Sequence, residues 1–159
     1  MNREEFITSV NSEQKQLRRF LLALCCGDND EADDIAQESL IKAYLSISSF
    51  HDRDKFTAWL YKIAHNTFLD RIRSKKLTED INKAHCVTDV NSASDRSFRY
   101  QELYAAIAMF PPKERSAILL FYMKGYSVKE IGSIINCSTD AVKKQLSRGR
   151  EHLKTKISR

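Results

Sequence analysis

Glycine and proline are scarce in this chain: its 159 residues include only four glycines and two prolines. A β-sandwich or β-barrel of this length needs many tight turns, so most all-β folds are excluded. No apolar run approaches the roughly 18 residues of a membrane-spanning helix, and the N-terminal residues are too polar for a secretory signal. We therefore expect an all-α, cytoplasmic protein without membrane insertion.

Cysteine is scarce as well, and the four cysteines form no Cys-x-x-Cys pair of the kind that binds zinc. Six acids between residues 28 and 38 suggest calcium at first sight. An EF-hand loop that began at Asp28 would place Asp33 where glycine belongs and Ser39 at its last ligand position, so this reading fails. We expect no metal, no cofactor and no catalytic residues, and hence a protein that is not an enzyme.

The net charge of +5 is unevenly distributed along the chain. Residues 51–77 carry seven bases and three acids, and residues 138–159 carry seven bases and two acids. Basic surfaces attract nucleic acid and acidic ones repel it. The distribution predicts two basic surfaces and one acidic surface, although solvated helix faces would give the same counts.

The spacing of apolar residues predicts helices through most of the chain, with two small helical domains at residues 1–77 and 98–159. Between them, residues 78–97 are polar and poor in large apolar side chains, as in a flexible linker. Asp28 or Asp30 can cap one helix, and Asp54 another. The predicted helices are 3–26, with a break near residues 11–12, then 31–46, 55–76, 98–110 and 112–123.

The strongest local signal lies in residues 127–153. Ser127 and Glu130 have the spacing of a capping box, which begins a short helix. A tight turn at residues 136–137 follows, and Ser138 can cap a second helix whose outward face is basic. This is the pattern of a helix-turn-helix, whose second helix fits the major groove of DNA. An ordinary helical hairpin with a solvated basic face is the alternative.

The helix predicted at residues 31–46 has two apolar faces. Ile41 and Leu45 lie on one of them, beside acidic side chains. The almost opposite face should pack inward and consists of Ala32, Ala36, Leu40, Ala43 and Ile47. An apolar centre with a polar rim is typical of a protein-binding surface. Alternatively, Ile41 and Leu45 contact another helix of the same domain.

The helix predicted at residues 55–76 is apolar over much of its circumference, except for one polar and basic stripe. Lys62, Asn66 and Arg73 lie on this stripe, and Lys76 is nearby. Aromatic side chains can stack on unpaired nucleotides, and neighbouring basic side chains can bind phosphate. The alternatives are core packing for Trp59 and simple solvent exposure for Asn66.

These stretches together resemble the extracytoplasmic-function (ECF) sigma factors of the bacterial sigma-70 family, over almost the whole chain. The stretches DIAQE at 34–38, FTAWLYKIAHN at 56–66 and DRIR at 70–73, with Phe50, are similar to region 2. The stretches FPPKER at 110–115, YSVKEI at 126–131 and VKKQLSRGR at 142–150 are similar to region 4. The resemblance implies an alternative sigma factor that directs core RNA polymerase to specific promoters and aids melting, with promoter DNA and an anti-sigma factor as further partners.

The resemblance also implies roles for individual residues. The docking face for the clamp helices of the polymerase is expected to contain Asp34, Gln37, Glu38, Ile41 and Leu45. The residues expected at the −10 element are Phe50, Trp59, Tyr61, Lys62, Asn66 and Arg73. The residues expected at the −35 element are Ser138, Lys143, Lys144, Ser147, Arg148 and Arg150.

The sequence departs from the usual pattern of region 4 over residues 138–141, where the family usually has Pro-Val-Gly-Thr, and at two later positions. Asp140 places an acid on the groove face, and Gln145 and Gly149 stand where arginine and alanine are commoner. The main rival is a helix-turn-helix regulator without sigma activity, which would leave residues 34–45 and 62–76 without a role. A magnesium-dependent nuclease is a more remote rival.

Overall fold

The computed structural model describes the backbone of residues 1–52, 55–78 and 95–157, and the side chains of residues 1–52, 55–76 and 101–154. All regular elements within these ranges are helical, as the sequence predicted. The elements are α1 (Arg3–Leu24), α2 (Asn29–Leu45), the 3-10 turn η1 (Ile47–Ser49), α3 (Phe56–Thr78), α4 (Asp95–Ala108), α5 (Pro112–Lys124), α6 (Val128–Ile135) and α7 (Thr139–Ile157).

The helix starts follow the capping residues in the sequence. Asp28 caps α2 by accepting a hydrogen bond from the backbone of Glu31, and Ser127 and Glu130 form the predicted capping box of α6. The predicted cap at Asp54 lies outside the described residues. The predicted break in the first helix is wrong: α1 is continuous. Its residues 11 and 12 are exposed, and the hydroxyl of Ser12 donates to the carbonyl of Ser9, so neither side chain disturbs the helix.

Two helix ends depend on the left-handed backbone conformation. Gly125 ends α5 with φ +69°, and Asn136 ends α6 with φ +58°. Glycine and asparagine adopt this conformation most readily, which explains the sharp turns before α6 and α7. The interval between α3 and α4 is shorter than the predicted linker of residues 78–97, because α4 already begins at residue 95. Residues 79–94 of that linker lie outside the described part of the chain.

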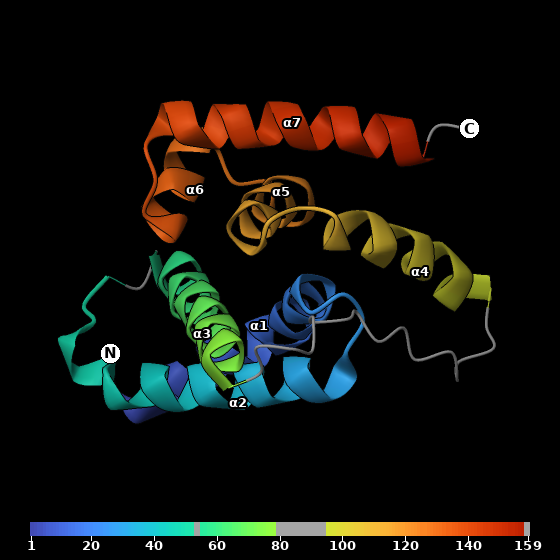
Figure 1. The fold of residues 1–159 in the computed structure, drawn as a ribbon. Coiled ribbons are helices and arrows are strands. Elements are labelled where there is room, and N and C mark those ends of the chain that lie inside the picture. Colours follow the sequence, from blue (N-terminus) through green and yellow to red (C-terminus); the bar gives the residue numbers. More distant parts are fainter. Residues whose placement is uncertain (53–54, 79–94, 158–159) are drawn as a thin grey trace.

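The helices form two groups (Figure 1): α1, α2 and α3 lie together, and α4 to α7 lie together across from them. The groups are in contact, because α1 packs against α5 and α3 packs against α6. Large fully buried side chains come from both groups, including Phe20 and Leu60 from one and Leu120 and Ile131 from the other. They belong to one continuous hydrophobic core. The exact domain boundaries remain a prediction.

Candidate interaction surfaces

The outer face of α2 exposes large apolar side chains to solvent. Ile41 is 60% exposed and Leu45 is 75% exposed, whereas Ala32 and Ala43 on the opposite side are buried. Tyr44, which the sequence analysis did not single out, is also exposed. The alternative that Ile41 and Leu45 pack against another helix therefore does not apply to the described arrangement. Exposed apolar groups of this kind mark a surface for a protein partner.

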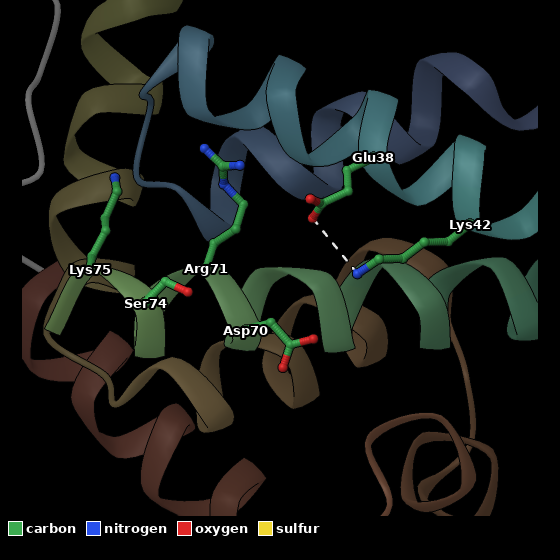
Figure 2. Close-up of a pocket in the computed structure, with 6 residues that line it drawn as sticks. All are labelled: Glu38, Lys42, Asp70, Arg71, Ser74 and Lys75. Carbon is green, nitrogen blue, oxygen red and sulfur yellow. Dashed lines mark ion pairs between the residues drawn. The ribbon is translucent and has the colours of Figure 1, made fainter. Parts of the chain in front are cut away.

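The polar residues expected around this face are on the surface too. Asp34 and Gln37 are exposed, and Glu38 is partly exposed. Glu38 forms an ion pair with Lys42 at 3.7 Å (Figure 2), one turn further along the same helix. The carboxylate of Asp34 lies 3.6 Å from the guanidinium of Arg71 on α3. The five predicted docking residues thus share one side of α2, with the acids at its border.

An ion-pair network holds α2 against α3 at this border. Arg71 donates to Glu31 at 2.7 Å, and the ammonium of Lys75 lies 3.1 Å from the same carboxylate. The hydrogen bond from Arg71 keeps the pKa of Glu31 below its ordinary value, against the opposing effect of burial. A cleft of about 340 Å³ adjoins the network, lined by both helices (Figure 2). The network fixes the orientation in which α2 presents its apolar face.

Two of the residues predicted to contact the −10 element stack on each other at the start of α3. The rings of Phe50 and Trp59 are nearly parallel, with centroids 4.4 Å apart, and both are half-buried. Phe56 packs against both rings, and Phe6 of α1 contacts Phe56. One face of Trp59 is therefore covered by the protein, which agrees with the core-packing alternative for part of this ring.

The polar stripe of α3 is exposed, as expected. Lys62, Asn66 and Arg73 all reach solvent, and Arg73 forms an exposed ion pair with Asp70 at 2.6 Å. Asn66 and Arg73 also line a cleft of about 500 Å³. The other wall of this cleft comes from the start of α5 and from the turn between α6 and α7, residues 111–113 and 135–137.

Tyr61 is not on this stripe, and its assignment to the DNA surface is wrong for the described arrangement. Its side chain is fully buried, with the ring 4.9 Å from that of Phe20 and below the ammonium of Lys124. Burial, with a contribution from the carboxylate of Glu13, raises the pKa of the Tyr61 hydroxyl. Within the described part of the chain, the hydroxyl has no hydrogen-bond partner. In this arrangement the Tyr61 side chain cannot touch DNA.

The second helix of the helix-turn-helix, α7, has the predicted two faces. Its inner face buries Val142, Leu146 and Gly149. The hydroxyl of Ser138 accepts a hydrogen bond from the backbone of Ala141 at 3.1 Å, which confirms the predicted cap. The side chains predicted to contact the −35 element are all exposed: Ser138, Lys143, Lys144, Ser147, Arg148 and Arg150.

Two arginines of α7 also contact α5. Arg148 lies 3.5 Å from the carboxylate of Glu114, and the guanidinium of Arg150 lies 5.9 Å from the ring centroid of Phe121. Exposed ion pairs contribute little to stability. These contacts hold both arginines on the side of α7 that faces α5.

Among the described side chains, no cluster of three or more His, Cys, Asp or Glu residues is arranged to hold a metal ion. Within the described residues, Cys25, Cys26 and Cys137 are not joined in disulfides. None of the helices in the described ranges combines the length and the apolar character needed to cross a membrane.

The sequence analysis missed the polar contacts that join the two groups of helices. The imidazole of His65 on α3 and the hydroxyl of Ser116 on α5 are hydrogen-bonded at 2.6 Å, and both residues are buried. Arg115 donates to the carbonyl of Leu24 at the end of α1. The partners are far apart in sequence, so no local pattern could have revealed them.

An all-helical fold with an exposed apolar face, a polar stripe and a helix-turn-helix defines a DNA-binding protein with a second, protein-binding surface. Residues 10–78 match Sigma-70 region 2, and residues 100–153 match Sigma-70, region 4. The chain belongs to the ECF family of RNA polymerase sigma factors, which act in transcription initiation.

Particular relatives agree with this assignment. The ECF RNA polymerase sigma factor SigW of Bacillus subtilis is 37% identical over 145 residues, which are 82% of this chain and 78% of that protein. EcfG of Rhodopseudomonas palustris is 29% identical over 95% of this chain and 82% of its own. The sigma factor RpoE of Bartonella quintana, solved in complex with the anti-sigma factor NepR, superposes with a TM-score of 0.80 at 25% identity and covers 98% of both chains.

Proposed function

We propose that this chain binds core RNA polymerase through α2, contacts the −10 element through the stripe of α3, and contacts the −35 element through α7. The single observation that best supports this division of labour is the exposure of Ile41 and Leu45 on a helix whose opposite face is buried. A DNA-binding protein that acted alone would have no use for such an apolar face.

At the −35 element, α7 offers the groove only polar and basic side chains. Lys143, Lys144 and Arg148 supply charge for phosphates or guanine edges, and Ser147 can donate to or accept from a base. The carboxylate of Asp140 would repel phosphate. It would instead accept a hydrogen bond from a donor on a base edge in the groove, such as the cytosine amino group.

At the −10 element, Asn66 is the best candidate for reading a base, because its amide both donates and accepts a hydrogen bond. Lys62 and Arg73 flank it on the same exposed face and would guide the strand. The stacked rings of Phe50 and Trp59 lie before this stripe and would form the apolar side of a pocket for an extruded base. By analogy with the Bartonella relative, an anti-sigma factor is the expected regulator.

Run-off transcription tests the proposal. Purified core polymerase with this chain should produce transcripts from a cognate promoter, whereas core alone should not. Asn66→Ala should lower open-complex formation on duplex DNA, with substantial rescue on a pre-melted bubble. DNA binding without any transcripts would favour a simple helix-turn-helix regulator, and magnesium-dependent cleavage would favour a nuclease. We also propose that the chain catalyses no reaction itself and works in the cytoplasm, where its polymerase is.

A further inference from the structure

The contact between the two groups of helices contains a charged cluster centred on Lys124, the last residue of α5. Its ammonium lies 3.2 Å from the carboxylate of Glu13 on α1 and also donates to Gln16. The same ammonium lies 5.2 Å from the centroid of the Tyr61 ring on α3. One cation therefore binds side chains of two helices in the opposite group.

Burial of both partners distinguishes this ion pair from the other ion pairs of the described residues. The side chains of Lys124 and Glu13 are only 12% and 18% exposed. By comparison, the exposed pairs of Arg18 with Asp33 and of Arg73 with Asp70 join residues within one group. Surface pairs contribute little, whereas removal of one partner of a buried pair leaves an uncompensated charge. Removal of Glu13 would therefore leave the Lys124 ammonium largely buried without an opposite charge.

Two further contacts accompany the cluster along the same boundary. Arg115 of α5 donates to the backbone carbonyl of Leu24 at the end of α1, and His65 of α3 is hydrogen-bonded to Ser116 of α5. All three contacts use α5, which joins the C-terminal group to the N-terminal group together with the packing of α6 against α3.

The closed arrangement is incompatible with simultaneous contact to both promoter elements. Their numbering places them about 25 base pairs apart, or about 85 Å at 3.4 Å per base pair. A compact chain of 159 residues has a radius of gyration of about 15 Å, hence a diameter of about 40 Å. The groups must separate before α7 and the stripe of α3 can contact both elements.

Closure also restricts access to the stripe itself. Asn66 and Arg73 line a cleft whose other wall consists of residues 111–113 and 135–137 of the C-terminal group. Tyr61 is fully buried beneath Lys124. Separation of the groups would remove the second wall of the cleft and uncover the Tyr61 ring.

We propose that Lys124, together with Glu13 and Gln16, is an intramolecular latch that holds this sigma factor in a closed, inactive state. Its consequence for initiation rests on the proposed function, whereas the closure itself does not. Breaking the latch should favour the open state, in which the docking and DNA-binding residues can act together.

Charge reversal in the full-length chain tests the latch. Lys124→Glu places two carboxylates opposite each other and should raise the radius of gyration, measured by small-angle X-ray scattering, from about 15 Å to about 20 Å or more. The double variant Glu13→Lys with Lys124→Glu restores opposite charges and should be more compact than the single variant. Lys129→Glu, an exposed reversal on α6, is the matched control and should remain compact. Far-ultraviolet circular dichroism should show unchanged helix content in all variants.

The functional readout is transcription with limiting sigma factor. Lys124→Glu should increase initiation about tenfold, which corresponds to ~1.4 kcal/mol, and the double variant should reduce this gain. An unchanged radius in Lys124→Glu, or a double variant as expanded as the single one, would overturn the latch whatever the transcription result. If the radius of gyration changes as expected but the chain never directs transcription by core polymerase, the proposed function is overturned and the latch stands.

Discussion

The two groups of helices present their candidate contact residues in opposite ways. On α2, Ile41 and Leu45 are apolar and remain exposed between acidic neighbours. On α7, the apolar residues Val142 and Leu146 are buried, and the outward face is polar and basic. Exposed apolar area favours a protein partner. A helix that buries its apolar residues and exposes basic ones favours DNA. The difference lets each surface be assigned to a class of partner before the identity of that partner is considered.

The largest expected effect comes from making the α2 face polar. Ile41→Ser together with Leu45→Ser should weaken binding to core polymerase by about 4 kcal/mol, or roughly a thousandfold, if both are interface hot spots. The free energy of unfolding should change little, because both side chains are exposed. A titration of labelled sigma factor with core enzyme measures the affinity.

Met109→Ser is the matched control for this experiment, because Met109 is also an exposed apolar residue but lies between α4 and α5. It should leave the affinity for core enzyme unchanged. If the double variant binds core enzyme with wild-type affinity, α2 is not the docking surface. The assignment of α2 to a protein partner and of α7 to DNA would then be wrong.

A pH titration of stability examines the boundary between the two groups. Burial, with the neighbouring Lys113 ammonium, lowers the pKa of His65 to about 4. The unfolded chain, with an ordinary pKa of about 6.5, binds a proton first as the pH falls. Folding stability from this residue is therefore complete above pH 6.5 and is lost progressively below it, by about 2 kcal/mol at pH 5 and about 3 kcal/mol below pH 4.

Urea unfolding between pH 4 and pH 8 measures this effect. His65→Asn keeps a polar atom near the Ser116 hydroxyl but cannot titrate, so its stability should depend less on pH in this range. If the free energy of unfolding depends equally on pH in the wild type and the variant, then protonation of His65 does not destabilise the contact between the two groups.

Sequence patterns predicted the surfaces of α2 and α7 because their information is local. The capping box at Ser127 and the 3.6-residue spacing of Val142 and Leu146 need only neighbouring residues. The ion pair of Lys124 with Glu13 spans 111 residues and depends on how α5 meets α1. The burial of Tyr61 was not predicted for a related reason, since only the packing of other helices shows that its ring is covered.

The groove face of α7 should respond to single substitutions at Lys143 and Arg148. If either binds a guanine edge, its change to alanine should cost about 1–3 kcal/mol and relax selectivity at one base of the −35 element. If it contacts phosphate alone, binding should weaken on all sequences and the salt dependence should fall by about one unit of slope. Fluorescence anisotropy with a panel of −35 duplexes at several salt concentrations separates these results.

Lys129→Ala on α6 is the control for the groove face, because it removes an exposed charge outside α7. Wild-type promoter ranking combined with a wild-type salt slope would remove the substituted residue of α7 from the DNA interface.

The inner face of α7 should affect stability but not promoter selectivity, which Gly149→Ala tests. A Cβ atom at Gly149 would lie 2.6 Å from Cδ1 and 2.8 Å from Cγ1 of Ile118 on α5, closer than normal contact. The close approach explains why glycine fits this position. Alanine would gain up to about 1 kcal/mol of helix propensity, but overpacking costs about 1–3 kcal/mol, so we expect a net loss of about 1 kcal/mol.

Ile118→Val removes Cδ1, so Gly149→Ala should cost less in that background than in the wild type. A double-mutant cycle of unfolding free energies should therefore show a favourable coupling of about 0.5 kcal/mol or more. The ranking of −35 sequences should be the same in all four proteins, because Gly149 is buried against α5 and faces away from the groove. Additive unfolding energies would show that Ile118 moves aside without cost. A changed ranking would mean that packing on α5 sets the position of the basic face, and that the two faces of α7 are not independent.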